Sequence, residues 1–181
     1  MSRPDGRLIV ITGGPGTGKT TLVEALGRHG FHPAPEICRA VMQAAAANDP
    51  RALPWNDLDL FAERVVEREI EAYAAHAARP GRSALDRAIP DIVGYLRLYD
   101  RPVPPRLGEA AGRLRYSKRV FLAPFWPAIY ANDAERYETP NQARAVGDAV
   151  EQAYRDLGYE PIVLPRVPVG ERARFVLANA T

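Results

Sequence analysis

The sequence predicts an α/β fold in which a single parallel β-sheet carries helices on both faces. An apolar run at residues 8–12 enters a glycine-rich loop and continues into an amphipathic segment, which is the pattern of a strand, a turn and a helix. More short apolar segments follow, each separated from the previous one by helical sequence. Strands that alternate with helices form a parallel sheet with right-handed crossovers.

The composition narrows the class of protein. The 181 residues, 46% hydrophobic and 25% charged, fit one globular domain that spans residues 1–181. The net charge of +2 favours neither a nucleic-acid nor a membrane partner, and no uncharged run approaches the ~18 residues of a membrane span. Cys38 is the only cysteine, which excludes an internal disulfide. We therefore expect a cytoplasmic protein, a monomer or a homodimer, that acts on a small molecule.

The predicted strands are short apolar runs that end at a glycine, a proline or a charged residue. They are residues 8–12, 31–34, 82–86, 120–123 and 161–164. Ligands of parallel sheets bind where the strands end at their carboxyl edge. The residues that end or directly follow each strand are therefore the candidate site.

The predicted helices begin or end at recognisable capping and breaking residues. Gly30 stops the first helix, residues 48–50 break the second, Asn56 or Asp57 caps the third, and Gly158 stops a later one. The helices predicted in this way are residues 19–28, 36–48, 57–78, 90–99, 106–118, 141–157 and a last one from about residue 170.

The loop after the first strand matches the phosphate-binding pattern G-x-x-x-x-G-K-[ST] at every specified position, through Gly13, Gly18, Lys19 and Thr20. Glycines let the backbone curl so that successive N–H groups form an anion-binding nest, and the following helix adds the positive end of its dipole. A ligand-free strand–helix turn is the alternative. The residues predicted to bind the nucleotide are Gly14, Pro15, Gly16, Thr17, Gly18, Lys19, Thr20 and Thr21.

Lys19 is predicted to reach the β- and γ-phosphates, and the Thr20 hydroxyl to bind Mg²⁺. Lys19 and Lys118 are the only lysines in a chain that otherwise uses arginine. The compact ammonium of a lysine at position 19 fits between phosphate oxygens, where the planar guanidinium of an arginine would not. The guanine signature N-K-x-D does not occur, so we expect ATP rather than GTP.

Two carboxylates lie at strand ends. Asp86 ends the third strand, where it can hold Mg²⁺ through water or accept a proton, and the alternative is a helix N-cap. Glu36 follows the second strand, where it can orient or deprotonate a hydroxyl, or simply favour the N-terminus of its helix. Which of the two is the base stays open. Arg39, one turn further, can pair with Glu36 or contact the substrate.

The segment at about residues 124–140 is predicted to be a lid that excludes water. It mixes prolines and aromatic residues with Arg136, which can close over the phosphoryl group as negative charge develops there. An exposed loop arginine is the alternative. Trp126 can form a wall of the acceptor pocket or pack within the lid.

The chain resembles the P-loop kinase-like proteins grouped as small "AAA-domain" ATP-binding proteins, which are similar to nicotinamide riboside kinase domains. The resemblance rests on residues 13–21, 35–39, 86–91, 94–95, 123–126, 133–138 and 154–164. It implies a P-loop NTPase fold with strand order 2-3-1-4-5 and a lid after strand four. It also implies a base at Glu36 and an acid–arginine pair at Asp86 and Arg87, with Arg87 beside the substrate.

These observations predict an ATP- and Mg²⁺-dependent kinase. It would move the γ-phosphate to a hydroxyl of a nucleoside-like molecule, another hydroxylated metabolite or an antibiotic. Lys19, Glu36, Asp86 and Arg136 would be catalytic, with Thr20 and Asp86 at the metal. No apolar strand ends in Asp-Glu, the water-activating signature of motor ATPases. A regulatory ATP- or GTP-binding protein without an acceptor is the alternative.

Overall fold

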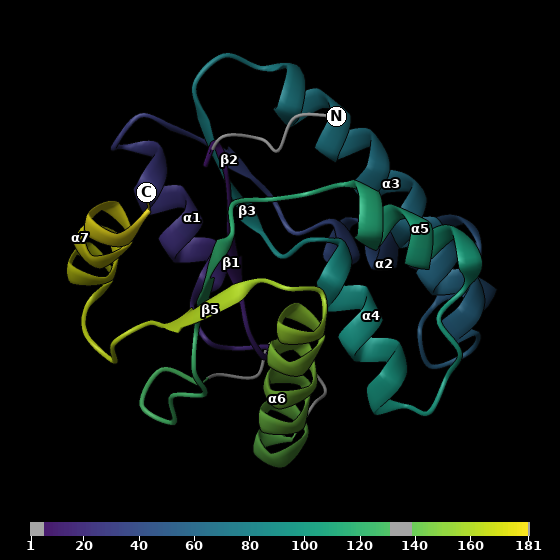
Figure 1. Ribbon diagram of the computed structural model, residues 1–181. Helices are drawn as coiled ribbons and strands as arrows, with labels where there is room; N and C mark the ends of the chain where they lie inside the picture. The colour runs from purple at the N-terminus through teal and green to yellow at the C-terminus, as the bar shows by residue number, and fades with distance from the viewer. Residues whose placement is uncertain (1–5, 131–138, 181) are drawn as a thin grey trace.

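The protein is built on a five-stranded parallel sheet (Figure 1). The computed structural model describes residues 6–130 and 139–180. The strands are β1 (Leu8–Thr12), β2 (Phe31–Ala34), β3 (Arg82–Asp86), β4 (Arg119–Leu122) and β5 (Glu160–Val163). Their order is β2-β3-β1-β4-β5, and every pair is parallel. The predicted α/β class and strand order are confirmed.

Except in the stretch 106–118, the helices lie within a few residues of the predicted ranges. They are α1 (Lys19–Gly27), α2 (Ile37–Asn48), α3 (Leu58–Ala78), α4 (Ile89–Leu98), α5 (Pro105–Arg113), α6 (Pro140–Asp156) and α7 (Val169–Asn179), with a short 3-10 turn at Pro50–Ala52. The Asp57 carboxylate caps α3 by accepting from the Leu60 amide at 3.0 Å, as predicted.

The basic stretch 106–118 is helical only as far as Arg113, so its prediction as one helix is wrong in its second half. The helix ends early because the chain after it has to run alongside β1. The Ser117 amide donates to the Leu8 carbonyl at 2.9 Å, and that bond requires extended backbone before β4 begins.

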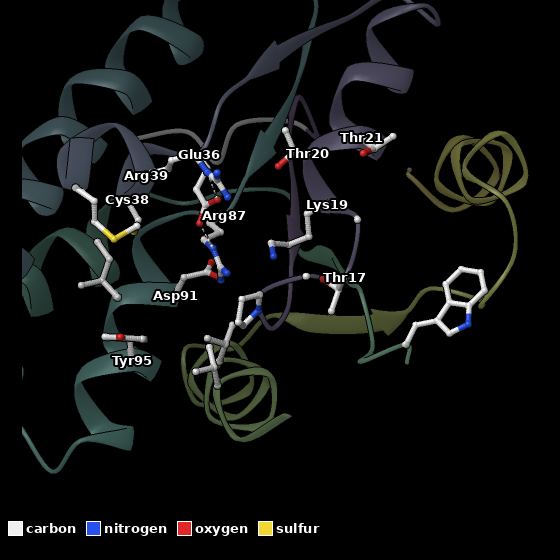
Figure 2. Close-up of a pocket in the computed structure, with 18 of the residues that line it drawn as sticks. Thr17, Lys19, Thr20, Thr21, Glu36, Cys38, Arg39, Arg87, Asp91 and Tyr95 are labelled. Carbon is white, nitrogen blue, oxygen red and sulfur yellow. Dashed lines mark hydrogen bonds and ion pairs between the residues drawn. The ribbon is translucent and has the colours of Figure 1, made fainter. Parts of the chain in front are cut away.

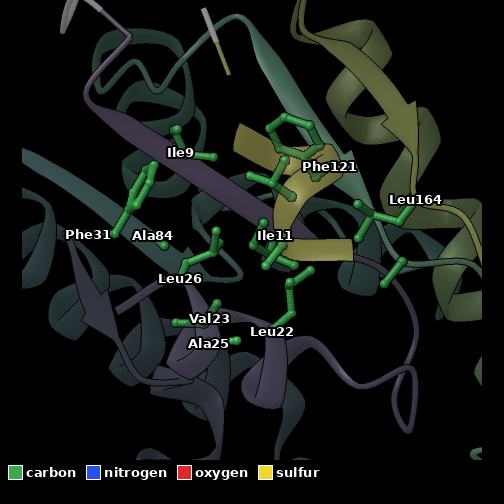
Figure 3. Close-up of a cluster of buried hydrophobic side chains, with 13 residues drawn as sticks. Ile9, Ile11, Leu22, Val23, Ala25, Leu26, Phe31, Ala84, Phe121 and Leu164 are labelled. Atoms are coloured by element: carbon green, nitrogen blue, oxygen red, sulfur yellow. The ribbon is translucent and has the colours of Figure 1, made fainter. Parts of the chain in front are cut away.

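The two faces of the sheet pack on different helices because side chains alternate along β1. Ile9 and Ile11 face α1 and α7 and form a buried cluster with Leu26 and Phe121 (Figure 3). Leu8 and Val10 form a second cluster on the other face with α6, centred on the buried ring of Tyr154. The apolar run of β1 is therefore buried on both sides, as expected for a central parallel strand.

Helices α2 to α5 lie together beside the sheet (Figure 1), and their buried side chains form a third cluster that also includes Ala153 of α6. Phe61, Ile92 and Leu96 belong to this core. Helix α4 joins it to the sheet because it packs closely on α6. A Cβ at Gly94 would lie 2.7 Å from the Cα of Val150, so only glycine allows this approach. This packing holds α4 in place, and the first turn of α4 carries Asp91, whose contacts are described below.

The carboxyl edge of the sheet brings together the segments that follow β1 and β3. Asp86 lies opposite Ile11 in the β1–β3 register, and the Arg87 amide continues the ladder by donating to the Ile11 carbonyl at 3.0 Å. Residues that follow β3 thus lie beside the loop that follows β1.

In the part of the chain that the structure describes, no helix is both long and apolar enough to cross a membrane.

Candidate active site

The loop between β1 and α1 wraps around its own Gly14 carbonyl. That oxygen accepts from the Lys19 ammonium at 2.8 Å and from the Thr17 hydroxyl at 2.9 Å. Gly16 and Gly18 have φ values of 71° and 76°, which L side chains rarely adopt. Helix α1 begins without a side-chain cap, and its first helical bond comes from the Leu22 amide to Gly18. The three amides before Leu22 therefore lack helical partners and can bind an anion.

Lys19 is 5% exposed. Burial, together with the positive charge of Arg87, lowers the pKa of its ammonium from 10.5 to about 8. Desolvation penalises the charged form, and a phosphate group placed beside the ammonium would reverse that penalty. Binding of a phosphate group would therefore stabilise the charged ammonium form of Lys19.

Asp86 and Thr20 supply the oxygens expected at a magnesium site. The Thr20 hydroxyl donates to Oδ2 of Asp86 at 2.5 Å. Oδ1 of Asp86 is buried and accepts no hydrogen bond from the residues that the structure describes. Burial raises the pKa of this carboxyl. A buried unpaired carboxylate oxygen beside a hydroxyl fits Mg²⁺, which binds through one or two protein oxygens and completes its shell with phosphates and water. The described residues hold no group of three His, Cys, Asp or Glu side chains suited to a metal.

Arg87 connects the loops after β1, β2 and β3. Its φ of 72° is left-handed, an unfavourable conformation for a residue other than glycine. The guanidinium donates from Nε to Oε1 of Glu36 at 2.7 Å, and from Nη1 to the Gly13 carbonyl at 2.9 Å and to Oδ1 of Asp91 at 3.1 Å (Figure 2). The strained backbone is therefore held by interactions with three separate segments.

Asp91 is a buried junction that sequence reasoning did not assign a role. Besides Arg87, its carboxylate accepts from the Thr12 hydroxyl at 2.7 Å, from the Tyr154 hydroxyl at 2.7 Å and from the Ala88 amide at 3.0 Å. The last bond satisfies the start of α4. Helix α4 is thus capped by Asp91 and not by Asp86, and the N-cap alternative for Asp86 is wrong.

Glu36 lies at the N-cap position of α2, yet its side chain makes no capping bond. It pairs instead with Arg87, and more loosely with Arg39 at 3.8 Å between Oε2 and Nε. Burial alone would raise the pKa of this carboxyl, but the charges of Arg87 and Lys19 outweigh it and lower the pKa. The structure therefore keeps Glu36 ionised, with one oxygen bound tightly and the other more loosely engaged.

The far side of the phosphate loop is covered by the chain after β4 and by α7. A Cβ at Gly16 would meet the Tyr130 ring at 2.6 Å, and one at Gly18 would meet Ile129 at 3.3 Å. Trp126 belongs to the same turn and lines the cavity described below. Its contact with an acceptor stays a prediction. Arg136 lies outside the described residues, so its role and that of the lid also stay predictions.

Arg172 is a second residue that sequence reasoning missed. It comes from α7, is 4% exposed, and donates from Nη1 to the Thr17 carbonyl at 3.0 Å. Its Nε is buried and makes no hydrogen bond to a described residue. Burial lowers the pKa of its guanidinium. Because 155 positions separate the two partners, no local pattern could have indicated this contact.

One cavity of about 440 Å³ joins these groups. Figure 2 shows Lys19 and Thr17 at one end, the Glu36–Arg87–Asp91 group in the middle, and Cys38 and Tyr95 at the other end. The predicted residues that line it are Pro15, Gly16, Thr17, Gly18, Lys19, Thr20, Thr21, Glu36, Arg39, Arg87 and Trp126. Gly14 and Asp86 are absent from this lining but bond to Lys19 and Thr20 respectively.

The sheet order, the glycine-rich loop and the Lys19–Thr20–Asp86 arrangement define a P-loop NTPase-type nucleotide-binding protein. The family model described as "AAA domain" matches residues 8–172. The chain belongs to this family. The comparison with curated proteins gives no match.

Solved structures of other proteins share the fold. A structure described as NadR protein in complex with NR is 19% identical, with a TM-score of 0.66 over 96% of this chain and 50% of the NadR chain. A second NadR structure, with NAD and AMP-PNP, is 17% identical, with a TM-score of 0.65 over 97% of this chain and 49% of that one. Deoxyadenosine kinase from M. mycoides is 12% identical, with a TM-score of 0.58. The match covers 95% of this chain and 97% of the kinase chain. This chain spans about half the length of NadR.

Proposed function

We propose that the protein is a kinase that transfers the γ-phosphate of Mg·ATP to a hydroxyl of a small molecule. The observation that carries the proposal is the single cavity that runs from Lys19 and Thr20 to Glu36. A phosphate donor at one end and an ionised carboxylate a short distance away are the two parts that phosphoryl transfer to an alcohol requires. The similar fold of deoxyadenosine kinase supports it.

The donor end binds the triphosphate through the free amides at the start of α1 and through the Lys19 ammonium. On binding, Lys19 would exchange the Gly14 carbonyl for phosphate oxygens. Thr20 and Asp86 would hold Mg²⁺, which neutralises charge on the β- and γ-phosphates when bound. Because Asp86 is already bonded to Thr20, we assign it to the metal and not to proton transfer.

The acceptor end orients the hydroxyl through Glu36. Its Oε1 is held by Arg87, which leaves Oε2 to accept from the substrate hydroxyl. The acceptor oxygen bonds to the γ-phosphorus as the bond to the β–γ bridging oxygen breaks, and the proton passes to Glu36 and then to solvent. The transition state of such transfers is loose, so little deprotonation is needed beforehand. A carboxylate with a lowered pKa serves mainly to orient the hydroxyl.

Arg136 and the predicted lid would complete the site by covering the transferring group. Arg87 is close enough to the loop, through its bond to the Gly13 carbonyl, to add positive charge there. Arg39, which faces the cavity and pairs loosely with Glu36, would contact the acceptor.

ATP consumption measured with and without a panel of nucleosides, vitamins and hydroxylated antibiotics tests this proposal. We expect one group of alcohols to raise ADP formation well above the slow background, and Lys19→Ala to abolish nucleotide binding. An exposed control, Lys118→Ala, should leave both unchanged. If no acceptor raises turnover, the regulatory NTPase without an acceptor becomes the better account.

A further inference from the structure

The acceptor end of the cavity is walled by apolar side chains from three helices. Helix α2 contributes Met42, α3 contributes Leu58 and Phe61, and α4 contributes Ile92 and Leu96. These residues also belong to the core that holds the helices together, so the walls are fixed by packing. The described residues that line the cavity include no asparagine or glutamine.

Tyr95 lines this end as well, and the other polar groups beside it are bonded to protein groups or neutral. All four partners of Asp91 are protein groups, and the Arg87 guanidinium bonds to Glu36, Gly13 and Asp91. Burial, and next the charge of Glu36, raises the pKa of the Cys38 thiol, which therefore stays neutral. Apart from Tyr95, polar recognition is thus concentrated where Glu36 and Arg39 lie, next to the predicted transfer position.

We propose that the acceptor is an alcohol whose carbon body is apolar, an aryl or alkyl alcohol, and not a nucleoside or a sugar. The inference rests on the proposed kinase function and deepens it. An apolar body gains from leaving water against Met42, Leu58 and Phe61. A nucleobase carries several hydrogen-bonding groups, and each one left unpaired in such an enclosure weakens binding by about tenfold or more.

Apart from Tyr95, which lines the opposite end, polar partners lie only at the hydroxyl end of the molecule in this arrangement. It would lie at Glu36 Oε2, with the remaining atoms directed along α2 toward Met42. Recognition therefore depends on shape and apolar contact, which distinguishes one added or missing methylene only weakly. The site is expected to accept several related aryl and alkyl alcohols.

The experiment compares two sets of acceptors with the full chain and Mg·ATP. One set holds benzyl alcohol, 2-phenylethanol and 1-hexanol, and the other holds uridine, adenosine and glucose. Phosphorylated product is detected by mass spectrometry, and binding of each alcohol is measured separately by calorimetry. A paired test uses Met42→Gln, which adds an amide to the wall, and the matched control Ala44→Gln, which adds it to an exposed position on the same helix.

We expect kcat/KM for the aryl and alkyl set to exceed that for the nucleoside set by at least about tenfold. Met42→Gln should raise the KM for the alcohols severalfold without changing the KM for ATP, and Ala44→Gln should change neither. Transfer to nucleosides or sugars in preference would overturn the inference and leave the kinase function standing. Binding of aryl alcohols without any transfer would support the apolar site and contradict the kinase function. Absence of binding by every alcohol of the first set would overturn the inference.

Discussion

The Nε of Arg87 donates to Oε1 of Glu36 at 2.7 Å, so the residue after β3 fixes the carboxylate after β2. Both side chains are largely buried, at 10% and 16% exposure. Arg87 also bonds to the Gly13 carbonyl at the start of the phosphate loop. One guanidinium therefore sets the position of the acceptor carboxylate relative to the donor loop.

The first prediction concerns Glu36→Gln. The amide keeps the shape of the side chain but loses the charge that accepts from the acceptor hydroxyl, so transfer should fall by at least about 100-fold. ATP affinity, measured by calorimetry, should change by less than about threefold because Lys19 and the loop amides are untouched. Equal loss of ATP binding and transfer would instead show that Glu36 is structural.

A second prediction follows from the pKa of about 8 at Lys19. Phosphate binds the ammonium form, so the free protein becomes less competent as pH rises through 8. The Kd for Mg·ATP should rise by about tenfold between pH 7 and pH 9. Since Lys19 and Lys118 are the only lysines, ¹³C-labelled lysine gives two NMR signals, and Lys118→Gln assigns them. A Lys19 signal that titrates near pH 10.5 with or without ATP would refute this prediction.

The third prediction concerns the stability of the Asp91 junction. Asp91→Asn removes the charge that Thr12, Tyr154 and Arg87 share, and breaking a buried pair costs roughly 3 kcal/mol of unfolding free energy. Tyr154→Phe removes one bond to the same carboxylate and should cost about 1.5 kcal/mol. Urea unfolding measures both. Equal stability of Asp91→Asn and the parent chain would show that the junction contributes nothing.

A fourth prediction concerns Glu69 on α3, which is 3% exposed. Burial, and next the charge of Asp91, raises its pKa from 4.5 to about 8. The folded state holds the proton more tightly than the unfolded chain, so the stabilisation is complete below pH 4.5 and is lost as pH rises through 8. The Gln side chain of Glu69→Gln stays neutral at every pH. The free energy of unfolding of this variant, relative to that of the parent chain, should therefore rise by at least about 1 kcal/mol between pH 5 and pH 9. Urea unfolding at the two pH values measures the gain, and a constant difference would contradict it.

Local patterns were enough to predict the strands and the phosphate loop. The strands are apolar runs ended by turn residues, and the loop depends on Gly13, Gly18, Lys19 and Thr20, which lie within eight positions. Glu69 could also have been identified, because it follows Phe61 and Val65 at a spacing of four and so lies on the buried face of α3. Its charged neighbours Glu67, Arg68 and Glu71 are exposed, so charge alone does not distinguish it from them.

The remainder of the site depends on contacts between distant residues. Asp91 meets Thr12 across 79 positions and Tyr154 across 63, and each partner alone resembles an ordinary strand or helix residue. The pairing of Glu36 with Arg87 spans 51 positions and depends on the strand order. The resemblance to known kinases implied roles for both residues, but their direct bond follows only from the fold.

The most direct measurement follows the γ-phosphate itself. ATP labelled at the γ-position is incubated with Mg²⁺, the protein and a pooled set of aryl alcohols, alkyl alcohols and nucleosides, and the label is separated into organic and inorganic phosphate. If the protein is a kinase, label appears in a phosphate ester, none appears with Lys19→Ala, and far less appears with Glu36→Gln. Label found only in inorganic phosphate, at a rate that no alcohol changes and that Glu36→Gln preserves, would contradict it.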